Sequence, residues 1–148
     1  MRLNTFTDYC LRVLMYAGAN ENALATIDEI AAAYGISRNH LMKVVLRLGQ
    51  LGYLETVRGK GGGLRLAKAP GAINLGKLVR ETEQDLALVG CFQGRAEPCA
   101  VEPACVLKRV LGEALGAFLK TLDGYTLADL LAPRRRLATL LAIPVPAA

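Results

Sequence analysis

The sequence lacks the marks of an exported or membrane-embedded protein. No signal-peptide-like apolar stretch begins the chain, because Arg2, Asp8 and Arg12 interrupt it. No apolar run reaches the roughly 20 residues of a membrane span. We therefore expect a cytoplasmic protein that does not enter a membrane. In that reducing compartment, its four cysteines favour metal or redox chemistry over structural disulfides.

The sequence also has little of what an enzyme active site needs. Histidine occurs once, at His40, and no cysteine lies near it along the chain. The glycine run Gly61–Gly63 lacks the strand and helix that flank a phosphate-cradling loop. We therefore expect a protein that is not an enzyme. A small electron carrier or a thiol enzyme is a further alternative for the function of this chain. The helix-turn-helix described below argues against it.

What the chain does have is apolar content and a concentrated basic segment. Its 148 residues are 53% hydrophobic, which is enough for one domain with a core, or for such a domain with an added assembly element. The net charge is +5. No acidic residue lies between Thr56 and Arg80, which predicts a surface that faces phosphates. The basic residues of this segment are Arg58, Lys60, Arg65, Lys68, Lys77 and Arg80.

Periodicity and capping residues predict a mainly α-helical chain with one small β-hairpin. Thr5 with Asp8, and Thr26 with Glu29, have the spacing of capping boxes at the starts of two helices. Ser37 has the place of an N-cap for a third helix. The expected helices are 5–20, 26–34, 37–51, 73–80, 103–122 and 126–131, the hairpin strands are 53–57 and 64–66, and 91–105 is a loop. The end, from Pro133 onwards, is expected to be loosely held.

The second and third helices have the spacing of a helix-turn-helix. Ala31 is small where the two helices would cross, Gly35 permits a left-handed turn residue, and Leu41 would pack the second helix against the first. This arrangement leaves the start of the third helix exposed as the edge that reads DNA. The expected contacts there are Ser37, Arg38, Asn39, His40 and Lys43.

The glycine-rich turn of the hairpin predicts a wing. Its glycines let the backbone approach a duplex closely, and Arg58 and Lys60 supply positive charge for a minor groove. Together with the helix-turn-helix, this predicts a winged-helix protein whose partner is double-stranded operator DNA.

The long helix predicts self-association. Its apolar face has nothing to cover it within a small winged domain, so the equivalent helix of a second chain is the natural cover, which gives a homodimer. Gly112 and Gly116 lower its intrinsic propensity, so packing must hold it. The face consists of Leu107, Leu111, Leu115, Phe118 and Leu122.

Three of the cysteines form a candidate metal site. Cys91, Cys99 and Cys105 are spaced C-x7-C-x5-C, which differs from the paired rhythm of a zinc ribbon. Three thiolates suit one face of an iron–sulfur cluster whose fourth iron position is completed by something else. Cys105 falls at the start of the long helix, where the helix dipole favours a thiolate. Ordinary buried cysteines, a dithiol switch and a zinc site remain open on spacing alone, and Cys10 is expected to pack in the core.

Several stretches together resemble a known family. They are FTDY at Phe6 to Tyr9, YGISRNHLMK at Tyr34 to Lys43, VRGKGGG at Val57 to Gly63, the three cysteines, and YTLADL at Tyr125 to Leu130. Over residues 1 to about 131, the chain resembles the nitric-oxide-sensitive repressors of the NsrR group, within the winged-helix family that also contains the iron–sulfur regulator IscR.

This resemblance implies a homodimer in which the loop cysteines bind an iron–sulfur cluster. It places Asp8 as the fourth ligand, contributed by the partner subunit, whereas Asp8 alone would read as a helix-capping carboxylate. Three cysteines and one oxygen favour a 4Fe–4S cluster, with 2Fe–2S as the alternative. The iron–sulfur assembly branch has a histidine three residues after the last cysteine, where this chain has Lys108.

The implied function is a repressor that binds DNA while its cluster is intact. Nitric oxide would nitrosylate the irons, break the tie to Asp8 and release the DNA, so that genes for nitric-oxide detoxification are expressed. The alternative keeps the DNA binding and lets the cluster sense iron supply, oxygen or redox state. The expected parts are a winged helix-turn-helix domain (1–80), a cluster-binding loop region (81–105), a dimerisation helix with a short C-terminal helix (106–131) and a tail (132–148).

Overall fold

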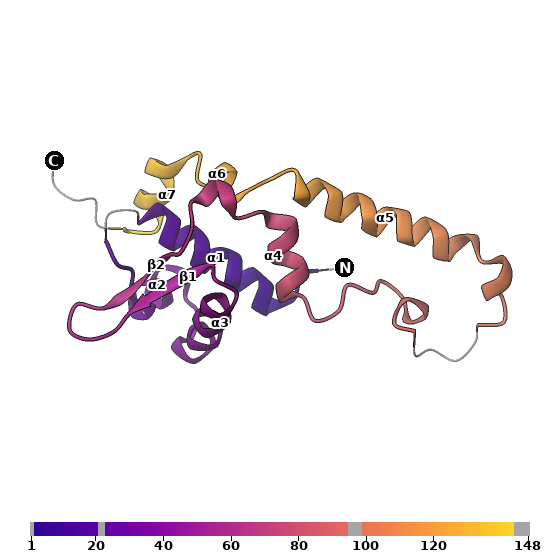
Figure 1. Cartoon of the computed structure of the whole chain (residues 1–148), viewed down its shortest axis with the longest axis horizontal. Coiled ribbons are helices and arrows are strands. Elements are labelled where there is room, and N and C mark those ends of the chain that lie inside the picture. The colour runs from indigo at the N-terminus through magenta and orange to yellow at the C-terminus, as the bar shows by residue number, and fades with distance from the viewer. Residues whose placement is uncertain (1, 21–22, 95–98, 144–148) are drawn as a thin grey trace.

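Helices dominate the computed structural model, which describes residues 2–20, 23–94 and 99–143. A compact head contains most of the elements, and one long helix, α5, extends from it as an arm (Figure 1). The elements are α1 (Thr5–Ala19), α2 (Ile27–Tyr34), α3 (Arg38–Gln50), β1 (Leu54–Val57), β2 (Gly63–Leu66), α4 (Leu75–Thr82), α5 (Val106–Asp123), α6 (Leu127–Leu130) and α7 (Arg134–Leu140), with short 3-10 turns at Pro70–Ala72, Gly90–Phe92 and Glu102–Ala104.

Helix α1 is the centre of the head. It packs against α2, α3, α4, α6, α7 and strand β2. Cys10, Val13 and Leu14 on its inner face are fully buried, so Cys10 is a core residue as expected. The helix-turn-helix completes this core through Ile30 and Leu41, which are also fully buried. The predicted mainly helical fold with one hairpin is confirmed.

The local signals for the second and third helices are confirmed. Thr26 and Glu29 form a reciprocal capping box at the start of α2. Gly35, which ends α2, is left-handed with φ 64°. Ser37 caps α3 through its side chain. These short-range features place the exposed start of α3 directly after the turn.

The predicted cap of the first helix is wrong. Asn4 caps α1, because its Oδ1 accepts a hydrogen bond from the Thr7 amide at 2.7 Å. Thr5 is already the first helical residue. Asp8 therefore lies about one turn inside the helix. Its carboxylate does not cap the helix and instead forms an ion pair with Arg12.

The hairpin is antiparallel, and its tip is rich in glycine. Leu54 pairs with Leu66 and Val57 with Gly63. Gly59 and Gly61 in the turn have positive φ values of 99° and 76°, which suit glycine. The hairpin projects away from the head, on the side opposite the arm (Figure 1).

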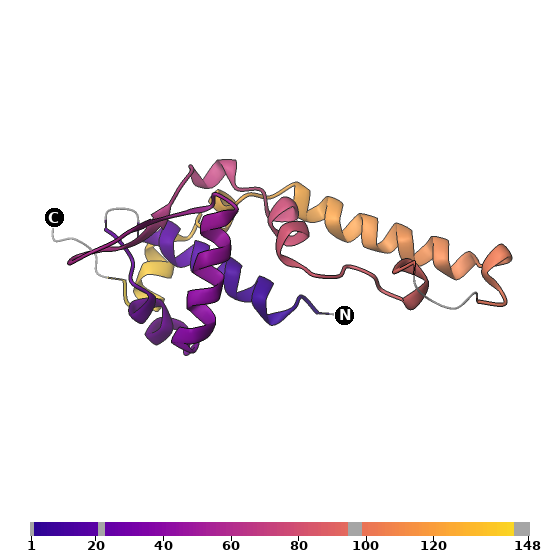
Figure 2. The ribbon, with the colours of Figure 1, turned by 60° about the horizontal axis from the view of Figure 1, so that its bottom comes forward.

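The arm is weakly covered within one chain. Helix α5 contains no buried residue, and Val106, Leu107 and Val110 near its start are 60%, 63% and 47% exposed. Leu115 and Phe118, nearer its end, line an apolar groove of about 620 Å³ shared with α4 and the segment after it. Turning the molecule shows that segment running beside α5 (Figure 2). Helix α4 itself spans 75–82, two residues later than expected, because Asn74 caps it.

The loosely held tail predicted from Pro133 onwards is wrong for the residues that the structure describes. Residues 134–140 form α7, and Ala138 and Ile143 are buried against the head. Arg134 donates from Nη2 to the Gly18 carbonyl oxygen at 2.5 Å. The arginines and prolines of this segment hid, at the level of sequence, the apolar residues by which α7 packs on α1. Residues 144–148 lie outside the described residues. Within the ranges 2–20, 23–94 and 99–143, no helix is both long and apolar enough to cross a membrane.

Candidate nucleic-acid interface and metal centre

The start of α3 presents an exposed polar edge. All five predicted contacts, Ser37, Arg38, Asn39, His40 and Lys43, are exposed. The Ser37 hydroxyl accepts a hydrogen bond from the His40 amide at 3.3 Å, which holds the first turn of the helix. Side chains at the N-terminus of such a helix are the ones that reach base edges in a major groove.

Arg38 has an internal partner in this edge. Its guanidinium forms an ion pair with Asp28 of α2, and this hydrogen bond raises the pKa of Arg38. Both side chains are well exposed. A phosphate or a guanine edge that binds Arg38 must therefore replace Asp28, which makes the contact an exchange of one acceptor for another.

The basic segment predicted to face phosphates divides into two groups. Arg58 and Lys60 at the wing tip are exposed and have no ion-pair partner among the described residues. By contrast, Arg65 pairs with Glu55 at 2.7 Å, and Arg80 pairs with Asp123 at 2.5 Å. The carboxylates come from outside the 56–80 segment, so the linear charge pattern could not show them. Lys77 lies 3.8 Å from Glu81, and Lys68 lies over the ring of Tyr53 without an ion-pair partner among the described residues. The cations of this segment without a carboxylate partner there are thus Arg58, Lys60 and Lys68.

Helix α1 connects Asp8 to this reading edge. Arg12 donates from Nε to Oδ2 of Asp8 at 2.9 Å, and the same guanidinium lies 5.6 Å from the ring centroid of Tyr34 at the end of α2. Tyr9 lies beside His40, with ring centroids 6.1 Å apart. Sequence reasoning missed Tyr9, Arg12 and Tyr34. The i, i+4 spacing of Asp8 and Arg12 was the one available signal.

The cysteines differ in environment. All four thiols are free. Burial raises the pKa of Cys10 to about 12, which makes it an inert core thiol. Cys105 caps α5, because its Sγ accepts a hydrogen bond from the Lys108 amide at 3.4 Å. The predicted position of Cys105 at the start of the long helix is confirmed.

Lys108 lies close to two of the three candidate ligands. Its Nζ donates to Oε1 of Glu102 at 2.7 Å. The pKa of Lys108 is raised, first by this hydrogen bond and also by the nearby Cys91 and Cys105 thiols. The Cys99 carbonyl oxygen accepts from the Glu102 amide at 2.9 Å, so the segment from Cys99 to Lys108 is locally ordered.

The donor chemistry fits an iron–sulfur cluster, but one chain does not assemble the ligand set. Within the described ranges, no group of three or more His, Cys, Asp or Glu side chains lies close enough to hold a metal ion. Asp8 belongs to α1 in the head, whereas the turn carrying Cys91 and the start of α5 lie along the arm (Figures 1 and 2). Cys91, Cys99 and Cys105 of one chain are therefore not gathered into a metal-binding group, and the ligand role of Asp8 stays a prediction.

Comparison with known proteins agrees with this architecture. Residues 3–133 match the Rrf2 family, described as an iron-dependent transcriptional regulator. The chain is 53% identical over 132 residues to the HTH-type transcriptional regulator NsrR of Bacillus licheniformis, covering 88% of this chain and 92% of that protein. It is 51% identical over 142 residues to NsrR of Bacillus subtilis, covering 95% and 97%.

Solved structures confirm the fold. CymR, the global cysteine regulator of B. subtilis, superposes with a TM-score of 0.71 at 26% identity, covering 88% of this chain and 95% of that one. IscR of T. potens superposes with the same TM-score of 0.71 at 22% identity, covering 99% and 94%. At that identity the second likeness concerns the fold alone.

Proposed function

The chain belongs to the Rrf2 family of transcriptional regulators, and we propose that it is a homodimeric repressor that releases its operator in response to nitric oxide. The observation that carries this proposal is the position of the free thiols of Cys91, Cys99 and Cys105. They lie along the arm, outside the head that carries the reading edge. This position supports a sensing site that is separate from the DNA-binding site.

The head supplies the DNA contacts. The start of α3 enters a major groove, where Arg38 and Asn39 form hydrogen bonds to base edges. Arg58 and Lys60 at the wing tip contact phosphates and the adjacent minor groove, because they are exposed and not neutralised by the described carboxylates. As in its relatives, which are named transcriptional regulators, the role is binding and not catalysis.

The arm supplies the dimer contact. The exposed side chains of Val106, Leu107 and Val110 and the groove lined by Leu115 and Phe118 leave apolar surface on α5 that a single chain does not cover. Pairing with the arm of a second copy covers this surface by a self-complementary contact.

The cluster ligands come from both subunits in this proposal. Cys91, Cys99 and Cys105 of one chain, with Asp8 of the partner subunit, form a set of three sulfurs and one oxygen that suits 4Fe–4S. When bound, such a cluster supplies iron atoms to which nitric oxide can bind. Asp8 keeps Arg12 on Oδ2, and its Oδ1 has no hydrogen bond to the described residues, so one oxygen is available for iron. A carboxylate is a more weakly held ligand of iron than a thiolate.

Helix α1 gives Asp8 a route to the reading edge. A shift of Asp8 moves Arg12, which is stacked on Tyr34 at the end of α2. It also moves Tyr9, which lies against His40 at the start of α3. The residues on both sides of the turn between α2 and α3 are therefore in contact with the first turns of α1.

One experiment tests the whole proposal. The protein is purified without oxygen, its iron and sulfide are counted, and nitric oxide is added stepwise while the absorption spectrum and operator binding are followed together. Parallel samples receive air or a chelator. Release by nitric oxide before any release by the other two supports the proposal, whereas release by chelator or air alone supports the alternative sensor of iron supply, oxygen or redox state.

Asp8→Ala tests the partner ligand. We expect a changed cluster spectrum and a changed nitric-oxide response, while Glu113→Gln, which removes an exposed carboxylate from α5, leaves both as in the wild type. An unchanged spectrum and response in Asp8→Ala would sink the ligand role.

A further inference from the structure

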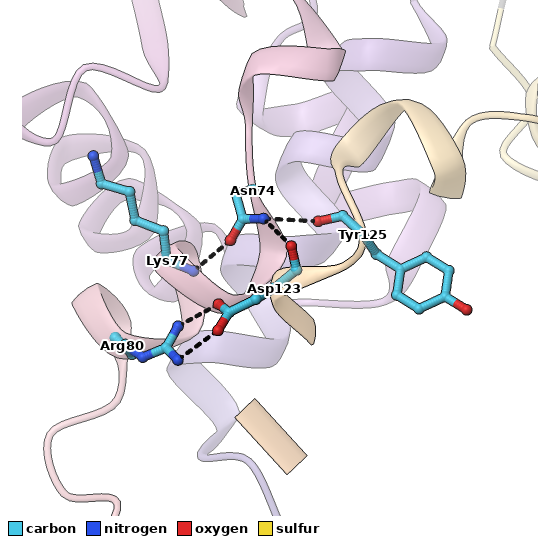
Figure 3. A network of polar contacts seen from close by, with 5 residues as sticks. All are labelled: Asn74, Lys77, Arg80, Asp123 and Tyr125. Atoms are coloured by element: carbon cyan, nitrogen blue, oxygen red, sulfur yellow. Dashed lines mark hydrogen bonds and ion pairs between the residues drawn. The ribbon is translucent and has the colours of Figure 1, made fainter. Parts of the chain in front are cut away.

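A polar joint attaches the arm to the head. Asp123, the last residue of α5, forms a bidentate pair with Arg80 of α4 (Figure 3). Arg80 donates from Nη1 to Oδ1 at 2.5 Å and from Nη2 to Oδ2 at 2.8 Å. This hydrogen bonding lowers the pKa of Asp123. Two parallel bonds fix the relative orientation of the two groups, which a single bond would not do.

Asn74 closes the same joint from the other side. Its Oδ1 accepts from the Lys77 amide at 2.9 Å and so caps α4. Its Nδ2 donates to the carbonyl oxygens of Asp123 at 2.8 Å and Tyr125 at 3.3 Å. One side chain therefore holds the start of α4 and the end of α5 together, as Figure 3 shows.

Gly76 leaves room for the Asp123 carboxylate against α4. A Cβ built at Gly76 would overlap Oδ1 of Asp123 and would lie 2.9 Å from Nη1 of Arg80. A larger residue at this position would therefore force the side chains of Asp123 and Arg80 to shift, which would disturb their ion pair. The backbone at Gly76, the side-chain amide of Asn74 and the ion pair of Arg80 with Asp123 therefore all hold the end of α5 against α4.

The length of the arm magnifies any change at this point. The 18 residues of α5 extend about 27 Å, so a rotation of about 10° at the joint moves the Cys105 end by about 5 Å. Within one chain, α5 has no buried residue, so its direction depends on this joint and on its contacts with α4 and the segment after it.

We propose that this joint sets the angle between arm and reading head, and thereby the half-site spacing that the dimer accepts. Asn74, Gly76, Arg80 and Asp123 are positioning residues in this proposal, since none of them lies on the reading edge. The inference rests on the part of the proposed function in which a homodimer reads two half-sites.

The test measures how strongly the protein prefers one spacing between the two DNA half-sites. If the joint residues only stabilised the fold, their substitution would leave this preference unchanged. The probe is a duplex selected from a random pool by the wild-type protein, together with versions that have one base pair inserted or removed at the centre. The variants are Asp123→Asn, Arg80→Lys, which keeps the charge but not the bidentate geometry, and Gly76→Ala. Glu113→Gln is the control, because it breaks the ion pair of Arg109 and Glu113 at 2.8 Å on the same helix, away from the joint.

We expect the wild type and the control to prefer the selected spacing by about tenfold, since a shift of one base pair also rotates one half-site around the duplex. In the three variants this preference should fall below about threefold, with unchanged affinity for a single half-site. Variants that keep the wild-type preference would overturn the proposal. If Asp123→Asn is unstable, the result for Arg80→Lys decides whether the proposal stands. A wild type that selects no paired half-sites overturns the dimer on which the proposal rests.

Discussion

The ring of Tyr9 on α1 lies 6.1 Å from the imidazole of His40 at the start of the reading helix. The contact is tilted, with 38° between the ring planes. It joins the helix that carries Asp8 to the helix that we propose faces DNA, across 31 positions of sequence. The same helix, α1, therefore forms the centre of the core with its inner face and touches the reading edge with its first turns.

Tyr9 and His40 should be energetically coupled. A double-mutant cycle of Tyr9→Leu and His40→Ala, followed by chemical unfolding of the cluster-free protein, is expected to give a coupling of about 0.5–1.5 kcal/mol. Tyr125→Leu in place of Tyr9→Leu is the control, because the Tyr125 side chain is 51% exposed. Coupling as small as in the control cycle would contradict the contact.

The two arginines of the hairpin should contribute differently to DNA affinity. Arg58→Ala is expected to weaken binding to any sequence and to reduce the slope of log affinity against log salt by about 0.9, which corresponds to one lost phosphate contact. Arg65→Ala should change the slope by less than half as much, because Arg65 is already paired with Glu55. DNA titrations at several salt concentrations measure the slope for each variant. An equal reduction of the slope in Arg58→Ala and Arg65→Ala would show that Arg65 contacts phosphate as well.

Cys10 should be the one thiol that resists alkylation in the folded, cluster-free protein. Its pKa of about 12 leaves about one molecule in ten thousand as thiolate at pH 8, and the residue is fully buried. Mass spectrometry after iodoacetamide treatment should find labels on the other three cysteines, and on all four after denaturation. Labelling of Cys10 in the native protein at the rate of Cys99 would be inconsistent with this core.

The same group predicts a loss of stability in alkali. The pKa of Cys10 is raised in the folded protein, so its contribution to the free energy of unfolding is complete below pH 9.0 and is lost as the pH rises towards 12. Over that range the wild type should lose about 1.4 kcal/mol per pH unit more than Cys10→Ala. Urea unfolding at several pH values compares the two slopes, and parallel slopes would show that Cys10 does not titrate there.

The C-terminal helix should contribute to the stability of the head. Ile143, which follows α7, is 6% exposed, whereas Leu140, the last residue of α7, is 72% exposed. Ile143→Ala is therefore expected to lower the free energy of unfolding by about 2–5 kcal/mol, and Leu140→Ala to leave it nearly unchanged. Similar unfolding curves for the two variants would mean that α7 does not pack as described.

Short-range features of the fold could be predicted from the sequence. The capping box of Thr26 and Glu29, the left-handed Gly35 and the cap at Ser37 depend on neighbours within a few residues, and the structure has all of them. The start of α1 was predicted at the right place with the wrong cap, because Asn4 and Thr5 are both suitable caps and only the backbone decides between them.

Long-range features of the site could not be predicted. Arg80 and Asp123 are 43 positions apart, and no periodicity relates them. The packing of Tyr9 against His40 likewise depends on how α1 crosses α3. The position of Cys105 at the start of the long helix could be predicted from local spacing, although its role as the N-cap could not, because the helix was expected to begin at about residue 103. The roles of Cys91, Cys99 and Asp8 together depend on a second chain and remain a prediction.

The absence of buried residues in α5 has a consequence for the order in which the molecule matures. An isolated helix of 18 residues is only marginally stable in water, whereas the head has its own core. The head can therefore fold while the arm still opens and closes, and amide protons of α5 should exchange long before those of α1. Folding then proceeds in stages, with the arm becoming ordered after the head is complete.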